Sequence, residues 1–232
     1  MPPLESIPLE TFPGKAEARA WARALLKDTC SRDRTARSAE ASARVLTLES
    51  FQACDLVLAF LSMPSEIDTS RVIRAAFKAG KRVAAPRMEG GEIVFAYLND
   101  SWESLPRDAL GIPTPPEGEL IFPEDLRGRG VFALIPGLLF DPCGGRLGRG
   151  KGYYDRFLTL VLSSLGSVVS GRPGSSAGAE ALPGASEHGL GFFVPCGFCF
   201  DAQVVPKVPR TARDVRIPLI VTEARLLDAL PR

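Results

Sequence analysis

The segment GGRLGRGKGYYD, residues 144–155, combines glycines with three cationic side chains and has the composition of a phosphate-binding loop. Gly145, Gly150 and Lys151 match most of the phosphate-loop pattern, in which a glycine-rich backbone surrounds a triphosphate and a lysine contacts its outer phosphates. Gly152 stands where that pattern requires Ser or Thr, whose hydroxyl binds magnesium. A metal bound with the phosphates would need another protein ligand, and Asp155 is the nearest carboxylate.

Imidazole and thiol chemistry have little support in this sequence. Its one histidine, His188, lies in the glycine-rich segment GASEHGLG, which is poorly suited to orient a catalytic base. Cys196 and Cys199 form one CxxC, a spacing found in redox sites and in half of a zinc site, but no second pair accompanies it. We therefore predict that both are buried strand cysteines. Five cysteines in scattered, apolar contexts also indicate a reducing compartment.

The charge balance of the chain limits its partners. The 232 residues include 28 basic and 27 acidic side chains, so no global field attracts the protein to nucleic acid or to an anionic membrane. No apolar segment approaches the roughly 20 residues that span a bilayer, and the first 14 residues lack the features of a signal peptide. We expect a cytoplasmic monomer without nucleic-acid or membrane partners, whose anion site is local.

Apolar runs and helical spacing alternate along the chain and predict the elements of an α/β fold. We predict a three-layer α/β/α architecture with a mainly parallel, doubly wound (Rossmann-like) sheet, in one domain of residues 1–232. Residues 1–13 are assigned to a tail and residues 163–191 to a flexible Gly/Ser-rich insertion. The predicted helices are 15–29, 36–51, 68–80 and 153–165, and the predicted strands are 55–62, 81–86, 91–98, 130–136, 192–200 and 218–223.

In doubly wound sheets, ligands bind at the carboxyl ends of the strands. The loops that follow LAFLS, FALIP and FCF are therefore expected to converge.

Four segments of the sequence resemble the motifs of one enzyme family. They are KAEAR at residues 15–19, FLSMPSEIDT at 60–69, IPGLLFDPCGGRLGRGKGYYDRFL at 135–158 and FCFDAQVVPKVPRTARDV at 198–215. In order and spacing these segments resemble the 5-formyltetrahydrofolate cyclo-ligases, also called methenyltetrahydrofolate synthetases. They extend over nearly the whole chain apart from the insertion.

The resemblance implies a ligase whose substrates are 5-formyltetrahydrofolate and ATP, with Mg²⁺ as the cofactor. ATP would phosphorylate the formyl oxygen, and N10 would then close the ring to give 5,10-methenyltetrahydrofolate. Such a reaction depends on positioning and charge stabilisation more than on acid and base catalysis, which suits a site rich in Arg and Lys.

The resemblance also implies roles for individual residues. Arg149 and Lys151 would be catalytic by neutralising charge on the transferred phosphoryl group, and Asp155 and Asp214 would hold the metal. Glu66 would accept two parallel hydrogen bonds from the pterin. The nucleotide would contact Lys15, Arg19, Gly145, Arg146, Leu147, Gly148, Arg149, Gly150, Lys151, Gly152 and Tyr153, and the folate would contact Leu61, Met63, Glu66, Tyr153 and Tyr154.

Each assignment has a purely structural alternative. The spacing of Lys15 and Arg19, taken alone, favours a solvated helix face. Glu66 fits a carboxylate that precedes a helix, and Asp155 fits an ion pair with Arg149 or Arg156.

Two alternative functions also remain open at the level of sequence. One is a paralogous ATP-dependent kinase or ligase that acts on another small anionic substrate. The other is a non-catalytic relative that binds a nucleotide or RNA.

Overall fold

The computed structural model describes residues 12–28, 31–108, 111–115, 118–165 and 191–229. Eight strands form one sheet, which confirms the predicted mainly parallel α/β class. The five neighbouring strands from β9 to β2 are parallel, and antiparallel strands flank them on both sides. In spatial order the strands are β10 (Leu226–Asp228), β9 (Leu219–Val221), β8 (Phe192–Phe198), β5 (Gly130–Ile135), β1 (Leu56–Leu58), β2 (Arg82–Glu89), β3 (Glu92–Tyr97) and β4 (Leu120–Ile121).

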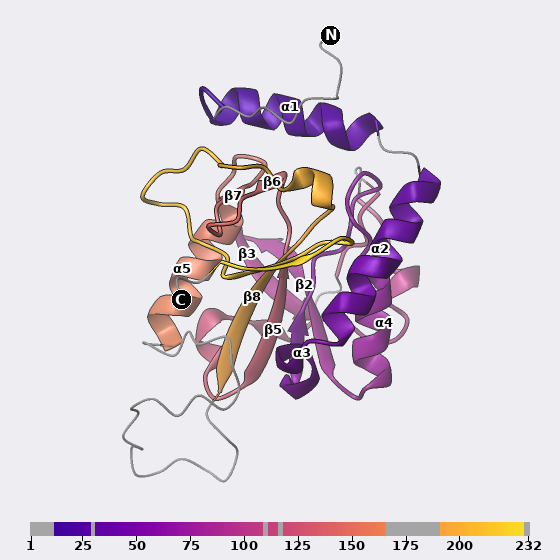
Figure 1. Cartoon of the computed structure of the whole chain (residues 1–232). Helices are drawn as coiled ribbons and strands as arrows, with labels where there is room; N and C mark the ends of the chain where they lie inside the picture. The colour runs from indigo at the N-terminus through magenta and orange to yellow at the C-terminus, as the bar shows by residue number, and fades with distance from the viewer. Residues whose placement is uncertain (1–11, 29–30, 109–110, 116–117, 166–190, 230–232) are drawn as a thin grey trace.

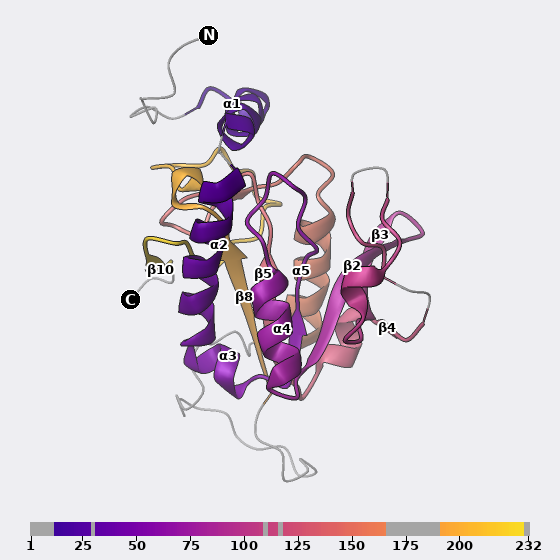
Figure 2. The ribbon, with the colours of Figure 1, turned by 90° about the vertical axis from the view of Figure 1, so that its right-hand side faces the viewer.

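Helices cover both faces of the sheet, as the three-layer prediction requires. Helices α2 (Ser31–Leu46), α3 (Glu49–Ala53) and α4 (Ser70–Lys78) lie on one face, and α5 (Tyr153–Leu165) lies on the other (Figures 1 and 2). Helix α1 (Lys15–Asp28) lies across the end of the sheet toward which the parallel strands point (Figure 2). Within the described residues, no helix is long and apolar enough to cross a membrane.

The strand sequences are apolar at consecutive positions because both faces of the sheet are buried. Val57 and Phe132 belong to the core beneath α2, α3 and α4, whereas Leu56, Leu58 and Val131 belong to the core beneath α5. All five side chains are fully buried. Successive residues of one strand thus supply two separate cores.

The order of the strands places a switch point between β1 and β5. Strand β1 is followed by α4 and then β2 on one side, whereas β5 is followed by α5 and then β8 on the other. Because the two connections leave in opposite directions, a crevice opens at the carboxyl ends of β1 and β5. The loop with Glu66 follows β1, and the glycine loop follows β5.

Several details differ from the sequence prediction. The helix predicted over 36–51 is two helices, α2 and α3, because the chain turns at Thr47 and Leu48. A short hairpin of β6 (Leu139–Phe140) and β7 (Arg146–Leu147) precedes the glycine loop. The central part of the insertion, 166–190, and residues 1–11 of the tail lie outside the described residues, and so does His188.

Asp141, which is 1% exposed, fixes the base of the glycine loop. Its Oδ1 atom accepts hydrogen bonds from the backbone N–H groups of Cys143 (2.9 Å) and Gly145 (2.8 Å). Its Oδ2 atom accepts one from the N–H of Val208 at 2.9 Å. One buried carboxylate therefore joins the loop after β6 to the segment after β8.

Gln203, which is 2% exposed, makes a second connection between the same two regions. Its Nε2 atom donates to the carbonyl oxygens of Gly137 (2.9 Å) and Leu138 (3.1 Å). Its Oε1 atom accepts a hydrogen bond from the N–H of Phe200 at 2.8 Å. The segment after β8 is thereby held against the chain that leaves β5.

We expect Gly145→Ala to lower the free energy of unfolding by about 2–3 kcal/mol, because overpacked buried sites cost this much. A Cβ atom there would lie 2.2 Å from Oδ2 of Asp141, a carboxylate that three N–H groups hold in place. Urea unfolding measures the effect. Gly118→Ala is the matched control, because its Cβ atom would have no neighbour within 4 Å. Equal free energies of unfolding for the two variants would show that Asp141 can move away from the added Cβ atom at no cost.

Candidate active site

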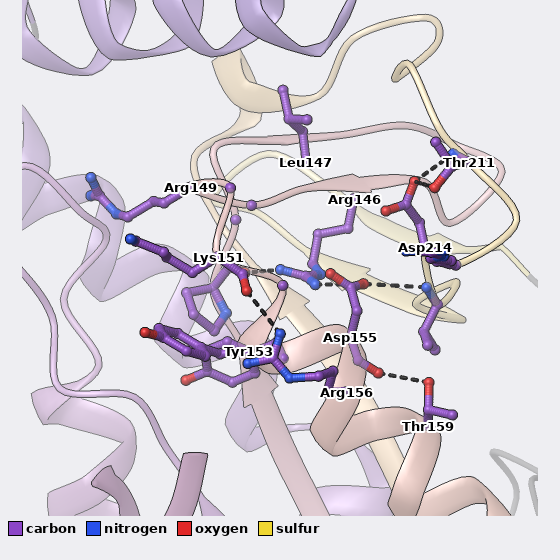
Figure 3. Close-up of a pocket in the computed structure, with 18 of the residues that line it drawn as sticks. Arg146, Leu147, Arg149, Lys151, Tyr153, Asp155, Arg156, Thr159, Thr211 and Asp214 are labelled. Carbon is purple, nitrogen blue, oxygen red and sulfur yellow. Dashed lines mark hydrogen bonds and ion pairs between the residues drawn. The ribbon is translucent and has the colours of Figure 1, made fainter. Parts of the chain in front are cut away.

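A cavity of about 1090 Å³ lies where the loops after β1, β5 and β8 meet. Its walls come from α1, from Glu66, from the glycine loop with the first turns of α5, and from residues 211–215. The three loops therefore converge as the sequence predicted. Figure 3 shows the glycine loop, the start of α5 and the segment with Asp214 around this space.

The backbone of the glycine loop explains its departure from the phosphate-loop pattern. Gly150 has φ +110° and Gly152 has φ +70°, which are conformations that residues with a Cβ atom rarely adopt. Gly152 immediately precedes α5, so the chain enters the helix through a left-handed residue. Ser or Thr at this position would be strained. The missing hydroxyl is thus a consequence of the turn geometry.

Arg146 and Asp155 form a partly buried ion pair beneath the glycine loop. Nη2 of Arg146 lies 2.8 Å from Oδ1 of Asp155, and the arginine side chain is 3% exposed (Figure 3). Nη1 of Arg146 donates to the carbonyl of Pro136 at 3.3 Å, and the N–H of Val215 donates to Oδ1 of Asp155 at 3.3 Å. The cationic partner of Asp155 is therefore Arg146, which corrects the alternative that named Arg149 or Arg156.

Lys15 of α1 contacts the segment after β8. Its Nζ atom lies 2.8 Å from Oδ1 and 2.6 Å from Oδ2 of Asp214. The N–H of Thr211 donates to Oδ2 of Asp214 at 2.5 Å. Burial alone would raise the pKa of Asp214, but the hydrogen bonds from Lys15 and Thr211 outweigh burial and lower this pKa below 3.8.

Glu66 faces the glycine loop across the cavity. Its Oε1 atom lies 2.8 Å from Nη2 of Arg149, and its Oε2 atom accepts the N–H of Met63 at 3.1 Å. Arg19 of α1 donates from Nε to the carbonyl of Gly148 at 3.0 Å. Neither Lys15 nor Arg19 lies on a purely solvated helix face, because both line the cavity.

Lys151 differs from the other cations of the cavity. Its side chain projects from the glycine loop (Figure 3), and the structure places no carboxylate against it among the described residues. Its backbone carbonyl accepts a hydrogen bond from Nη1 of Arg156 at 2.9 Å. The loop is therefore fixed at the backbone of Lys151 while its ammonium group remains available to an anion.

Most of the predicted site residues line this one cavity, namely Lys15, Arg19, Glu66, Arg146, Leu147, Gly148, Arg149, Gly150, Lys151, Gly152, Tyr153, Tyr154, Asp155 and Asp214. Leu61, Met63 and Gly145 do not line it. Leu61 is 5% exposed and belongs to the core beneath α2, α3 and α4. Gly145 is buried against Asp141, so its predicted nucleotide contact has no cavity-facing surface in this structure.

The cavity also contains residues that the sequence interpretation missed. Glu92 of β3 binds Nε of Arg156 through both carboxylate oxygens, at 2.9 and 2.7 Å. Thr159 lies one turn after Asp155 on α5 and donates to its carbonyl at 2.7 Å. Helical spacing from Asp155 could have indicated Thr159, but no local pattern could have indicated Glu92, which lies 64 residues before Arg156 in the sequence.

The donor set is compatible with one metal ion that arrives with phosphates. The described residues contain no cluster of three or more His, Cys, Asp or Glu side chains of the kind that holds a metal alone. Mg²⁺ commonly binds one or two carboxylates together with substrate phosphates and water. Oδ1 of Asp155 is occupied by Arg146 and Val215, which leaves Oδ2 for a metal, whereas both oxygens of Asp214 contact Lys15.

The cysteines of the CxxC are buried, as predicted. Cys196 lies in β8 and Cys199 follows this strand, and neither is more than 1% exposed. Burial raises the pKa of both thiols well above the ordinary value. Both thiols are therefore protonated and inert at neutral pH.

A doubly wound sheet with a cationic glycine loop at its switch point is an arrangement in which many α/β proteins bind anionic ligands. A sequence profile described as the 5-formyltetrahydrofolate cyclo-ligase family matches residues 12–169. This chain belongs to that family, which is a family of ligases.

Relatives from distant organisms support this family assignment. The chain is 34% identical over 150 residues to the 5-formyltetrahydrofolate cyclo-ligase of Mus musculus, covering 62% of this chain and 73% of the relative. It is 28% identical over 188 residues to a probable 5-formyltetrahydrofolate cyclo-ligase of Schizosaccharomyces pombe, covering 79% and 82%. The NMR structure of 5,10-methenyltetrahydrofolate synthetase from Aquifex aeolicus superposes with a TM-score of 0.71 at 26% identity, covering 94% of each chain.

We expect Asp214→Asn to alter the pH dependence of stability. The pKa of Asp214 is lower in the folded state, so the ion pair with Lys15 stabilises the fold above the unfolded pKa and stops doing so as pH falls through the folded pKa. The variant should be about 1 kcal/mol less stable from pH 5 to 8, and this difference should shrink below about pH 4. Urea unfolding across this range measures it. A difference in the free energy of unfolding between the two proteins that stayed constant down to pH 3 would contradict the stabilising role of the ion pair between Lys15 and Asp214.

Proposed function

We propose that this chain uses ATP to cyclise 5-formyltetrahydrofolate to 5,10-methenyltetrahydrofolate, with ADP and phosphate as the other products. The observation that carries the proposal is the ion pair between Glu66 and Arg149 across the cavity, at 2.8 Å. This ion pair places Glu66, a carboxylate that could bind a pterin, in direct contact with the glycine loop, which could bind a triphosphate. Membership of the cyclo-ligase family supports the assignment of Glu66 to the pterin and of the glycine loop to the triphosphate.

The chemistry requires the formyl oxygen to become a leaving group. In the proposed reaction this oxygen attacks the γ-phosphorus of ATP, and the bond from that phosphorus to the bridging oxygen of ADP breaks. N10 then attacks the formyl carbon, its proton is lost, and the C–O bond to phosphate breaks. The product is the methenyl cation. Neither step requires a histidine, and both depend on orientation and on neutralisation of charge.

The glycine loop would stabilise the transferred phosphoryl group. Lys151 has an uncommitted ammonium group in the cavity, and Arg149 lies two residues away on the same loop. The first N–H groups of α5, from Tyr153 onward, add fixed dipoles that favour negative charge. Lys15 and Arg19 face this loop from α1 and would contact the remaining phosphates.

Glu66 would bind the pterin, whose 2-amino group and adjacent ring N–H are parallel donors that match a carboxylate. In the structure one oxygen of Glu66 contacts Arg149. Folate binding would therefore replace this ion pair and release Arg149 toward the phosphates. Tyr153 and Tyr154 also line the cavity and are proposed to contact the folate.

Magnesium is proposed as the cofactor, held by Oδ2 of Asp155 and, once Lys15 turns to the phosphates, by Asp214. When bound, the ion would neutralise phosphate charge. Arg146, which is buried, would keep Asp155 oriented toward the cavity through their ion pair.

The activity is tested by incubating the protein with ATP, magnesium and 5-formyltetrahydrofolate and following the near-ultraviolet absorbance of the methenyl product. We expect a rise that requires all three components. ATP hydrolysis that folate does not stimulate would indicate a kinase or ligase for another substrate. Absence of any ATP-dependent change would contradict the proposal.

We expect Lys151→Ala to reduce kcat about 100-fold while KM for ATP changes less than about fivefold. The contact of Lys151 with the phosphoryl group should strengthen toward the transition state, and removing such a contact costs about 3 kcal/mol. Steady-state kinetics at saturating folate measures both constants. Lys207→Ala is the matched control, because Lys207 is an exposed lysine outside the cavity. A variant whose KM rises while kcat is retained would limit Lys151 to ground-state binding.

A further inference from the structure

Thr69, at the end of the Glu66 loop (residues 59–69), departs from the usual chemistry of a helix start. It is the N-cap residue of α4, where a threonine side chain normally accepts a hydrogen bond from a backbone N–H of the first turn. Here the side chain makes no capping hydrogen bond. Its Oγ1 atom instead donates to the carbonyl of Phe60 at 2.7 Å, at the other end of the loop. Because Thr69 is 1% exposed, this hydroxyl serves the loop and neither the helix nor solvent.

The Glu66 loop depends on side chains for its closure. Its backbone, which the structure describes in full, makes one hydrogen bond to itself, from the N–H of Glu66 to the carbonyl of Met63 at 2.9 Å. The Oγ atom of Ser62 donates to the carbonyl of Ile67 at 2.7 Å and accepts the N–H of Thr69 at 3.1 Å. The hydroxyl oxygens of Ser62 and Thr69 lie 3.1 Å apart. These two hydroxyls therefore join the part of the loop that leaves β1 to the part that enters α4.

The closure holds the backbone next to Glu66. Ile67, whose carbonyl is bound by Ser62, is 2% exposed and packs in the core beneath α2, α3 and α4. The N–H of Asp68 donates to Oγ of Ser38, a buried residue of α2, at 2.9 Å. The residues that follow Glu66 are thus fixed to the body of the protein. A segment without regular structure can therefore hold a carboxylate at a defined place on the cavity wall.

Neither of the two hydroxyls belongs to the cavity. Glu66 lines the cavity, whereas Ser62 and Thr69 do not, so either hydroxyl can affect a ligand only through the loop. The carboxylate of Glu66 contacts Arg149 at 2.8 Å and the N–H of Met63 at 3.1 Å. In the proposed reaction folate replaces Arg149. From that moment the position of Glu66 depends on its own loop, and hydrogen bonds weaken with small changes in distance and angle.

We propose that Thr69 is a positioning residue for folate binding, whose hydroxyl closes the Glu66 loop and thereby holds the carboxylate in place for the pterin. This inference rests on the proposed function and deepens it. Thr69 touches neither substrate. Its hydrogen bond orders the loop before the ligand arrives, so that less conformational freedom is lost on binding. The proposed nucleotide contacts lie on α1 and the glycine loop, so ATP binding does not depend on this hydroxyl.

The test compares two substitutions that differ in the hydroxyl. Thr69→Val keeps the shape of the side chain without the donor, whereas Thr69→Ser keeps the donor. Calorimetry measures the affinity for a non-hydrolysable ATP analogue with magnesium, and then the affinity of that complex for 5-formyltetrahydrofolate. We expect Thr69→Val to weaken folate binding about 10-fold and to leave binding of the nucleotide analogue within about twofold, because the support of one contact is lost. Thr69→Ser should bind folate within about threefold of the original protein, because its donor is retained.

A double-mutant cycle with Glu66→Gln shows whether the hydroxyl acts through this carboxylate. In the Glu66→Gln background, we expect Thr69→Val to change folate affinity by less than about threefold, because the contact that it supports has already been altered. Thr47→Val is the matched control. The hydroxyl of Thr47 also donates to a backbone carbonyl, that of Arg44 at 2.8 Å, but Thr47 is exposed and lies outside the cavity. This control should change neither affinity.

Several outcomes would overturn the inference. Unchanged folate affinity in Thr69→Val, or equal losses for folate and the nucleotide analogue, would show that the hydroxyl does not position Glu66. A Thr69→Ser protein as weak as Thr69→Val, or an undiminished loss in the Glu66→Gln background, would show the same. If urea unfolding shows that Thr69→Val does not fold, Ser62→Ala tests the same closure and should give the same selective loss. If the original protein binds no folate and forms no methenyl product, the proposed function itself fails, and this inference fails with it.

Discussion

The buried carboxylate of Asp141 is the group on which the geometry of the cavity depends. It collects backbone N–H groups from its own loop and from Val208, 67 residues further along the chain. Hydrogen bonds to an ionised acceptor are stronger than neutral ones, and burial excludes competing water. Gln203 makes a parallel connection from the segment after β8. These hydrogen bonds fix the base of the glycine loop. The loop can therefore hold a defined shape although it is rich in glycine.

Three of the ion pairs in the cavity, those of Arg146, Lys15 and Arg149, differ in what they can do. Arg146 is enclosed by protein, so removing its partner Asp155 would leave a buried charge unpaired. Lys15 with Asp214 and Arg149 with Glu66 are partly exposed to solvent, and such pairs contribute little to stability. The first pair is consequently part of the framework. The other two pairs can be replaced by a ligand at small cost.

Much of this arrangement could be predicted from the sequence, and the exceptions have physical reasons. Consecutive apolar residues and helical spacing identified the central parallel strands, α1, α4 and α5. The β6–β7 hairpin was missed because strands of two residues carry no periodicity. The partner of Asp155 was sought among the arginines nearest in helical or loop spacing, but β7 returns Arg146 beneath the first turn of α5. Glu92 reaches the cavity through sheet pairing, which leaves no local pattern.

Seven cationic side chains line the cavity, and four of them are paired with carboxylates, which leaves Arg19, Lys151 and Arg213 without a carboxylate partner among the described residues. Arg149 and Lys15 each face a carboxylate of their own. An anion that bound Arg149 or Lys15 would have to separate these two pairs and would leave Glu66 or Asp214 without compensation, whereas Lys151 can be reached without this cost. A ligand set that brings an anion for the cations together with donors or a metal for the carboxylates satisfies both halves at once. At Arg149 and Lys15 the paired carboxylates thus favour a ligand set of this kind over a simple phosphate.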